Sequence, residues 1–362
     1  MKILITGNMG YVGGAVVRRL RQQHPHAIII GFDSAFFAHC LTTRREFPER
    51  MLDRQIFGDV RTMRAGDLAG YDAVILLAAV SNDPMGERFS DVTAEINQNA
   101  CVSIAYAAAA AGVRNLVFAS SCSVYGVAEG GPRRESDPVS PMTAYASSKV
   151  NTERALENVK GDMVITSLRF ATACGMSDRL RLDLVLNDFV ASALANGRID
   201  VLSDGTPWRP LIDTADMARA IEWAATRSRN DGGRNLVVNA GANTANYQVH
   251  ELADAVAASV PGCQVSINRE APADSRSYRV DFSRFAELAP SYVPQIGLTT
   301  SVHELVTGLM DLGFCDPDFR SSPLVRLQVL KRLIAEGRLS EDLRWAPAMR
   351  SEIPAPLEEI RA

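Results

Sequence analysis

Residues 2–22 of the chain read KILITGNMGYVGGAVVRRLRQ, and this stretch decides the fold. Residues 2–6 form a short apolar run of strand type, and residues 11–22 have helical spacing with arginines on the outer side. Between them the glycines are spaced as GxxGxxG. Glycines there permit a tight turn and let a pyrophosphate approach the backbone at the helix N-terminus. The stretch therefore predicts a strand, a phosphate-binding turn and a helix.

The rest of the chain continues this alternation before it becomes irregular. Further strand-like runs occur at residues 27–32, 73–78, 115–119 and 163–168, separated by segments of helix length. This pattern predicts an α/β fold, a doubly wound parallel sheet covered by helices on both faces. We expect residues 1–170 and about 210–240 to form this Rossmann domain, residues 171–209 and 241–312 a smaller discontinuous α/β unit, and residues 313–362 a helical extension and tail.

The extension has a pattern of its own. Residues 323–336 place Leu327, Leu330 and Ile334 on one helical stripe, so we expect the helix to pack on the body of the protein or on another subunit. Residues 346–362 carry three prolines and mixed charge, which is typical of a loosely held tail.

Composition excludes several classes of partner. A formal net charge of −4 provides no basic field for nucleic acid or an anionic membrane. The six cysteines form no CxxC pair and no zinc-type spacing, so we expect free thiols and no metal site. The N-terminus passes directly into a strand without a signal peptide, and no apolar run is long enough to cross a bilayer. We therefore expect a cytoplasmic protein.

The end of the second strand indicates which dinucleotide binds. Asp33 stands about twenty residues after the glycines, where a carboxylate accepts hydrogen bonds from a ribose 2′-hydroxyl and repels a 2′-phosphate. This favours NAD over NADP. The carboxyl ends of the first four strands should then supply the cofactor site, namely Gly7, Met9, Gly10, Tyr11, Val12, Gly13, Asp33, Asp59, Val60, Leu77, Ala78 and Ala79.

A tyrosine and a lysine form the candidate chemical centre. Tyr145 and Lys149 stand at i and i+4 on one helical face. A free tyrosine has a pKa near 10, and a nearby cation is expected to lower it. Ser121 follows an apolar strand at its carboxyl end, so its hydroxyl can bond the same reacting oxygen. The three groups suit proton exchange with a hydroxyl while hydride moves to or from a nicotinamide.

With these motifs the chain resembles the extended short-chain dehydrogenase/reductase superfamily, in its sugar-nucleotide epimerase and dehydratase branch. The resemblance covers about residues 1–312 and rests on GNMGYVG, FD, GDV, LLAA, SSCSVYG, YASSK, LRFATACG, SDGTPWRPLID and DSRSYRVD. It implies that Ser121, Tyr145 and Lys149 form a catalytic triad beside NAD. It also implies that Asn99 lies below the nicotinamide and that Phe170 lies near its ring.

The resemblance further implies a nucleotide-diphosphate sugar as substrate, bound mainly by the smaller unit. The matching positions for its diphosphate and base are Thr172, Asp183, Leu184 and Asn187. Arg209 and Arg276 match phosphate clamps, which suits a guanidinium, although a structural salt bridge is the alternative for Arg209. Ser81 is either a sugar contact or part of a capped turn. The expected sugar site also includes Ser121, Cys122 and Ser123.

The resemblance leaves the reaction open. An epimerase would oxidise a hydroxyl, expected at C4, and return hydride to the opposite face; a 4-ketoreductase or 4-dehydrogenase would use the same residues with net redox. A non-catalytic NAD-sensing protein is a third alternative, because fold does not determine function. The 4,6-dehydratases carry an Asp-Glu pair where this chain has Cys122 and Ser123, which disfavours dehydration. A homodimer through a four-helix bundle of residues 95–111 and 145–159 is also implied.

Overall fold

The centre of the molecule is a seven-stranded parallel sheet. A computed structural model describes residues 1–44, 46–126, 130–271 and 277–347. The strand order is β10-β6-β5-β4-β1-β2-β3, and every neighbouring pair is parallel. The strands are β1 (Lys2–Thr6), β2 (Ile28–Asp33), β3 (Arg54–Phe57), β4 (Ala73–Leu76), β5 (Asn115–Ser121), β6 (Val164–Phe170) and β10 (Asn235–Ala240). The predicted doubly wound parallel sheet is confirmed.

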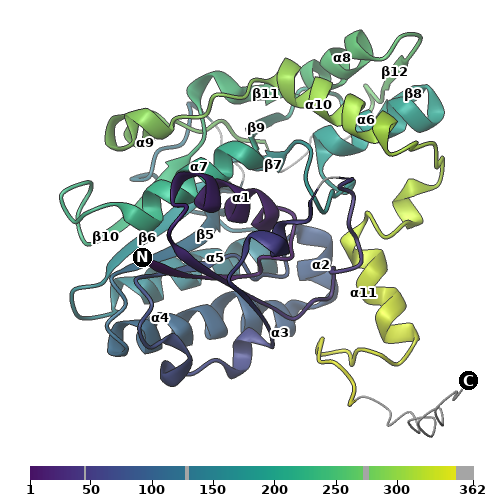
Figure 1. The fold of residues 1–362 in the computed structure, drawn as a ribbon. Coiled ribbons are helices and arrows are strands. Elements are labelled where there is room, and N and C mark those ends of the chain that lie inside the picture. The colour runs from purple at the N-terminus through teal and green to yellow at the C-terminus, as the bar shows by residue number, and fades with distance from the viewer. Residues whose placement is uncertain (45, 127–129, 272–276, 348–362) are drawn as a thin grey trace, which may run out of the picture.

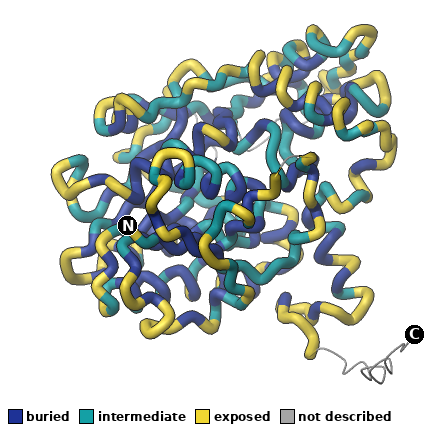
Figure 2. The backbone as a smooth tube through the Cα atoms, in the orientation of Figure 1, coloured by how far each residue is buried: buried dark blue, intermediate teal, exposed yellow. Residues whose placement is uncertain are grey.

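Helices cover both faces of this sheet, because its strands are apolar on both sides. In β1, Ile3 and Ile5 belong to the apolar cluster of α1 (Gly13–Gln23) and α7 (Thr214–Thr226), whereas Leu4 belongs to the cluster on the opposite face. That face carries α4 (Cys101–Ala110) and α5 (Ala144–Glu157), with the π-helix η4 (Ala94–Ala100) between the short α3 (Ser90–Thr93) and α4. Figure 2 shows the buried strands between exposed outer loops.

A second unit lies above the carboxyl edge of the sheet (Figure 1). It contains a three-stranded sheet in the order β11-β9-β7 and a parallel pair of β12 with β8. Helices α6 (Val185–Asn196), α8 (Val249–Ser259) and α10 (Leu298–Asp311) pack on one another around a third apolar cluster. The strands are β7 (Thr172–Cys174), β8 (Arg198–Val201), β9 (Trp208–Asp213), β11 (Asn246–Gln248) and β12 (Gln264–Ile267).

Short elements complete the chain and include the turns that carry site residues. These are α2 (Asp83–Arg88), α9 (Ser283–Leu288), η1 (Pro48–Met51), η2 (Val60–Thr62), η3 (Ala65–Leu68), η5 (Cys122–Tyr125), η6 (Asn243–Ala245), η7 (Pro290–Tyr292) and η8 (Phe319–Ser321).

The C-terminal extension contains α11 (Arg326–Ala335), which packs on the body of the protein. Its buried face is formed by Arg326, Val329, Leu330 and Leu333. The buried face of α11 is therefore rotated from the predicted stripe of Leu327, Leu330 and Ile334 and shares only Leu330 with it. The prediction considered apolar residues alone, whereas the buried face includes an arginine. The predicted tail lies mostly outside the described residues.

Candidate active site

The glycine turn between β1 and α1 has no room for a side chain at Gly7 or Gly13. Gly7 has a φ of +76°, and a Cβ there would stand 2.5 Å from the backbone nitrogen of Ala78; one on Gly13 would stand 2.2 Å from the carbonyl oxygen of Asn8. Helix α1 begins after Val12 with no side-chain cap on its N–H groups. Uncapped N–H groups at the positive end of a helix bind anions, so the turn fits a pyrophosphate.

Asp33 is held ready at the end of β2. Its carboxylate accepts hydrogen bonds from the backbone N–H groups of Met9 (3.0 Å) and Ala35 (2.7 Å). Burial raises the pKa of this carboxyl, and the two N–H groups oppose that rise. Each oxygen keeps acceptor capacity for ribose hydroxyls. Met9 itself is buried and does not line the cavity, so its part is to position Asp33.

One cavity of about 1010 Å³ extends from the glycine turn into the second unit. It is at the upper end of the size range of small-molecule sites, so it has room for a dinucleotide and a second ligand. Most sequence-predicted site residues line it: Gly7, Gly10, Tyr11, Val12, Gly13, Asp33, Asp59, Val60, Leu77, Ala78, Ala79, Ser81, Ser121, Ser123, Tyr145, Lys149, Phe170, Thr172, Asp183, Leu184 and Arg209.

The catalytic candidates converge at the carboxyl end of β5. The Ser121 hydroxyl and the Tyr145 phenol approach each other there, and the serine favours the ionised phenol. Thr143 caps α5 by accepting from the N–H of Ala146 (3.1 Å), which places Tyr145 in the first turn. Lys149 is buried, and its Nζ donates to the carbonyl of Ala119 (2.8 Å) and lies 5.3 Å from the Tyr145 ring centroid.

The electrostatics of this group differ from the sequence expectation. Burial raises the pKa of Tyr145 to about 12, and the Ser121 hydroxyl only partly opposes the rise. Burial lowers the pKa of Lys149 to about 8. The expected lowering of the tyrosine pKa is thus absent in the chain alone, because desolvation disfavours both charged forms and the ammonium is bound to a backbone carbonyl.

Asn97, and not Asn99, is the asparagine anchored beside the cavity, where it bonds the main chain of the cavity residue Val80. Asn99 is exposed and does not line the cavity, which corrects its assignment below the nicotinamide. The Asn97 side chain is fully buried; its Oδ1 accepts from the N–H of Val80 (2.8 Å), and its Nδ2 donates to the Val80 carbonyl (2.9 Å) and the Ser148 hydroxyl (3.3 Å). In the sequence, the proximity of Asn97 to the apolar residues Ile96 and Ala100 was the one indication that its side chain is buried.

Two predicted substrate contacts are structural instead. Cys122 lies in η5 with no exposed surface, and its thiol donates to the carbonyl of Arg169 (3.1 Å). Asn187 is also fully buried; its Nδ2 donates to the Tyr11 hydroxyl (2.9 Å) and the Arg181 carbonyl (2.8 Å). Neither side chain lines the cavity, because each bonds backbone or a second buried side chain. Arg276 lies outside the described residues.

Arg181 is a cavity residue that sequence reasoning missed. It pairs with Asp183 (2.9 Å) and donates to the Ser81 hydroxyl (2.8 Å), while Asn82 donates to Asp183 (2.7 Å) and caps α2. Burial opposes ionisation of Asp183, but Arg181 outweighs it and holds the pKa of that carboxyl below its usual range. Ser81 is therefore part of a polar network as well as a cavity residue.

A buried ion pair links helix α5 to the strand next to β5, which ends in Ser121. Arg169 on β6 donates to Glu153 on α5 (2.7 Å), and Glu153 also accepts from the Ser120 hydroxyl (2.5 Å). Both charged side chains are less than 10% exposed. The pair ties α5 to the strands on which Ser121 and Phe170 stand.

Two other kinds of site are absent from the part of the chain that the structure describes. No group of three or more histidine, cysteine or acidic side chains there could hold a metal ion. Within the same residues, no helix is both long and apolar enough to cross a membrane.

Comparison with known proteins agrees with this geometry. The model of the NAD dependent epimerase/dehydratase family matches residues 3–241. A dTDP-glucose 4,6-dehydratase of Streptomyces griseus is 26% identical over 83% of this chain and 92% of its own. A UDP-glucose 4-epimerase of Corynebacterium glutamicum is 27% identical over 70% of this chain and 79% of its own.

Solved structures show the same fold. MoeE5 in complex with UDP-glucose and NAD has a TM-score of 0.71 at 24% identity, covering 86% of this chain and 99% of its own. A UDP-glucose-4-epimerase from Stenotrophomonas maltophila has a TM-score of 0.73 at 21% identity, covering 86% and 99%. The chain therefore belongs to the NAD-dependent epimerase/dehydratase family and is an NAD-dependent enzyme of the extended short-chain dehydrogenase/reductase type.

Proposed function

We propose that the protein epimerises a nucleotide-diphosphate sugar by transient oxidation of a sugar hydroxyl, expected at C4. The observation that carries this proposal is the pairing of the Ser121 hydroxyl with the Tyr145 phenol in a cavity with room for two ligands. NAD, for which the glycine turn and Asp33 are the binding groups, supplies the hydride acceptor and donor. The UDP-glucose 4-epimerase relatives support the same reaction class.

Tyr145 carries the proton in this reaction. Its phenolate removes the proton from the sugar hydroxyl and its phenol returns it, while Ser121 hydrogen-bonds the same oxygen. A phenol with a pKa of about 12 is almost entirely protonated at neutral pH, so formation of the phenolate needs positive charge in the cavity. Arg181 provides part of it, since its charge opposes the rise of the Tyr145 pKa. Lys149 is the second cation at this end of α5.

Dehydration is disfavoured by the residue that follows Ser121. Cys122 has no exposed surface, its thiol is bound to the Arg169 carbonyl, and burial raises the pKa of that thiol. A group with these properties neither reaches a sugar nor exchanges a proton with it. The acid pair that eliminates water in the 4,6-dehydratases therefore has no equivalent at this position.

A nucleotide-sugar panel in deuterated water tests the reaction. An isomeric product without deuterium at carbon, and without net change in NADH, is expected for epimerisation. A product two mass units away with a matching NADH change would replace this proposal by net oxidation or reduction, and loss of water would replace it by dehydration. No turnover on any sugar nucleotide would favour an NAD-sensing protein.

A tyrosine variant tests the assigned role. Tyr145→Phe should lower turnover by about 10²–10⁴-fold, the usual contribution of general acid–base catalysis, while NAD binding persists. Tyr292→Phe is the matched control, because Tyr292 packs on the Rossmann core and does not line the cavity. Near-normal turnover of Tyr145→Phe would refute the role.

We also propose that the enzyme acts in carbohydrate biosynthesis in the cytoplasm as a homodimer, with η4, α4 and α5 pairing with their symmetry mates in a four-helix bundle. The outer face of α4 carries Tyr106 and small residues, which permit close approach of another helix. Light scattering that finds only monomer at working concentration would contradict the dimer.

A further inference from the structure

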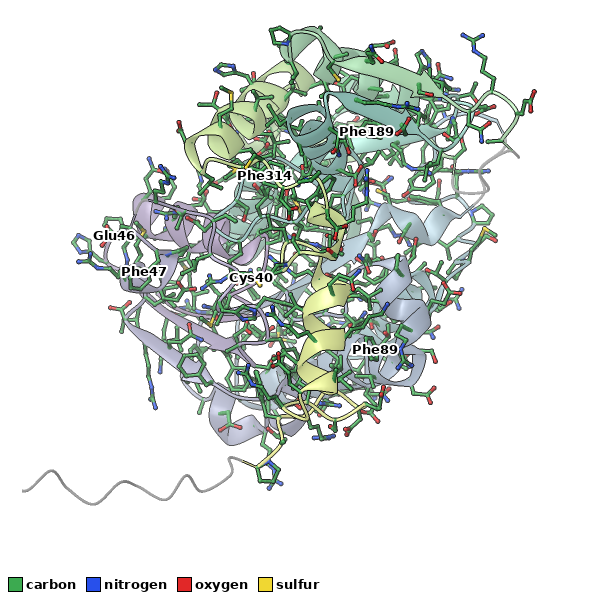
Figure 3. All side chains as sticks on the ribbon, turned by 90° about the vertical axis from the view of Figure 1, so that its right-hand side faces the viewer. Cys40, Glu46, Phe47, Phe89, Phe189 and Phe314 are labelled. Atoms are coloured by element: carbon green, nitrogen blue, oxygen red, sulfur yellow. The ribbon has the colours of Figure 1, made fainter. Side chains whose placement is uncertain are left out.

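The C-terminal extension joins the two units across the cavity. Phe319 belongs to the apolar cluster of the second unit, whereas Val329, Leu330 and Leu333 belong to that of the Rossmann sheet. In Figure 3, α11 stands between the segments that carry Cys40 and Phe89, below Phe189 and Phe314. The solved relatives are matched over 99% of their own chains but cover 86% of this one, so part of this chain has no counterpart in them.

Residues of the extension form part of the cavity wall. Arg326, Leu330 and Leu343 line the same cavity as Asp33 and Phe37. Asp33 is the candidate ribose ligand, and the extension contacts the segment that follows it, since Arg326 lies over the Phe37 ring and Trp345 bonds the Ser34 carbonyl. The extension thus contributes wall surface where the cofactor is expected.

The end of the described extension is fixed to the loops after β2 and β3. Arg61 donates to the carbonyls of Asp342 (2.8 Å) and Leu343 (3.0 Å), and the Trp345 indole N–H donates to the Ser34 carbonyl (2.6 Å). Leu343 has a φ of +52°, a conformation that bulky residues rarely adopt. These bonds hold Leu343 against the cavity despite its unfavourable backbone.

Arg326 is an unusual residue for a cavity wall. It is 1% exposed, and its donors reach only the carbonyls of Arg179 (2.7 Å) and Pro323 (3.3 Å). Its guanidinium lies 4.9 Å from the Phe37 ring centroid, and burial lowers the arginine pKa to about 10. Among the described residues no carboxylate forms an ion pair with it, and Asp183 acts on it only at longer range. A buried cation is costly unless an anion compensates it, and a diphosphate is such an anion.

We propose that Arg326 binds the diphosphate of NAD and that Leu330 and Leu343 cover its adenosine half, which makes the extension a built-in part of the cofactor site. The position of Arg326 on the Phe37 ring, four residues after Asp33, favours this diphosphate over that of the sugar nucleotide. Because the proposal concerns cofactor binding alone, it is independent of the sugar reaction.

Calorimetric titration of full-length cofactor-free protein with NAD⁺, ADP, adenosine and UDP tests the proposal. Arg326→Gln should weaken NAD⁺ and ADP binding about tenfold to a hundredfold, the usual effect of losing a charge-assisted hydrogen bond, and leave adenosine and UDP unchanged. Arg326→Lys should recover part of the loss. Lys331→Gln, on an exposed position of the same helix, should bind all four ligands normally.

The other outcomes would overturn the proposal. Equal weakening of adenosine and ADP would make Arg326 a structural residue. Weakening of UDP alone would assign it to the sugar nucleotide. If Arg326→Gln unfolds, Trp345→Ala provides the second measurement. This variant removes the indole hydrogen bond to the Ser34 carbonyl and should speed NAD⁺ release in stopped-flow fluorescence. An unchanged release rate in a folded variant would contradict a role for the extension in cofactor binding.

Discussion

Asn97→Ala should destabilise the protein strongly even though the residue is not expected to touch a substrate. The Asn97 side chain makes both hydrogen bonds to the main chain of Val80 and a third to Ser148. Val80 is 5% exposed, so water does not replace the lost bonds. Each buried polar group left unpaired costs about 1–3 kcal/mol, so loss of the two Val80 bonds should lower the free energy of unfolding by about 2–6 kcal/mol.

The neighbouring asparagine provides the control for this experiment. Asn99→Ala removes an exposed side chain and should change the free energy of unfolding by no more than about 0.5 kcal/mol. Asn97→Asp places a carboxylate at this fully buried position, opposite the Val80 carbonyl, so it should cost at least as much as Asn97→Ala. Urea unfolding followed by circular dichroism measures all three variants.

The same variants should differ in cofactor affinity. Val80 follows the Leu77–Ala79 edge of the cavity, so release of its main chain should weaken NAD⁺ binding in Asn97→Ala and not in Asn99→Ala. Similar unfolding costs for the two alanine variants, or a cost below about 0.5 kcal/mol for Asn97→Ala, would refute the assignment of Asn97 as the anchoring residue.

Two further predictions concern buried charges. Glu153→Gln leaves the Arg169 guanidinium without its carboxylate and should lower the free energy of unfolding by about 3–5 kcal/mol. Asp200→Asn, in the exposed pair with Arg198, is the control and should cost about 1 kcal/mol or less. Equal costs of the two variants in urea unfolding would contradict the prediction for the buried pair. Lys149 has a pKa of about 8 in the folded chain and about 10.4 in the unfolded chain. Between these two pH values the unfolded state binds more protons than the folded state. The free energy of unfolding should therefore rise with pH across that window by about 3 kcal/mol. Lys149→Met should remove this rise, and an unchanged pH profile of the variant would show that the ammonium is not desolvated.

Local patterns were sufficient to bring the residues of the predicted cofactor site together. Gly7, Gly10 and Gly13 lie between a strand and a helix, and Asp33 ends the next strand, so their spacing along the chain already determined their spacing in space. The carboxyl ends of parallel strands meet at one edge, which also brought Ser121 to Tyr145. These contacts follow from strand and helix geometry without knowledge of the rest of the fold.

The errors have a common physical origin. The π-helix at Ala94–Ala100 changes which side chains face inward, so the helix pattern alone did not distinguish Asn97 from Asn99. The 3₁₀ turn η5 likewise directs Cys122 into the core, although its neighbours Ser121 and Ser123 line the cavity. In both segments the helical turn is tighter or wider than in an α-helix, so side chains face other directions than an α-helical pattern predicts.

The amino-acid sequence by itself determined the parallel sheet and the family, and it predicted that Ser121, Tyr145 and Lys149 line one site, because each depends on periodicity or on short spacings along the chain. Only the tertiary structure decided how their charges behave and that Arg181 and Arg326 line the cavity. The pKa values of Tyr145 and Lys149 depend on desolvation by segments far apart in the chain. Arg326 reaches the cofactor side because apolar residues of α11 pack on the Rossmann sheet, a contact between the two ends of the sequence that no local pattern encodes.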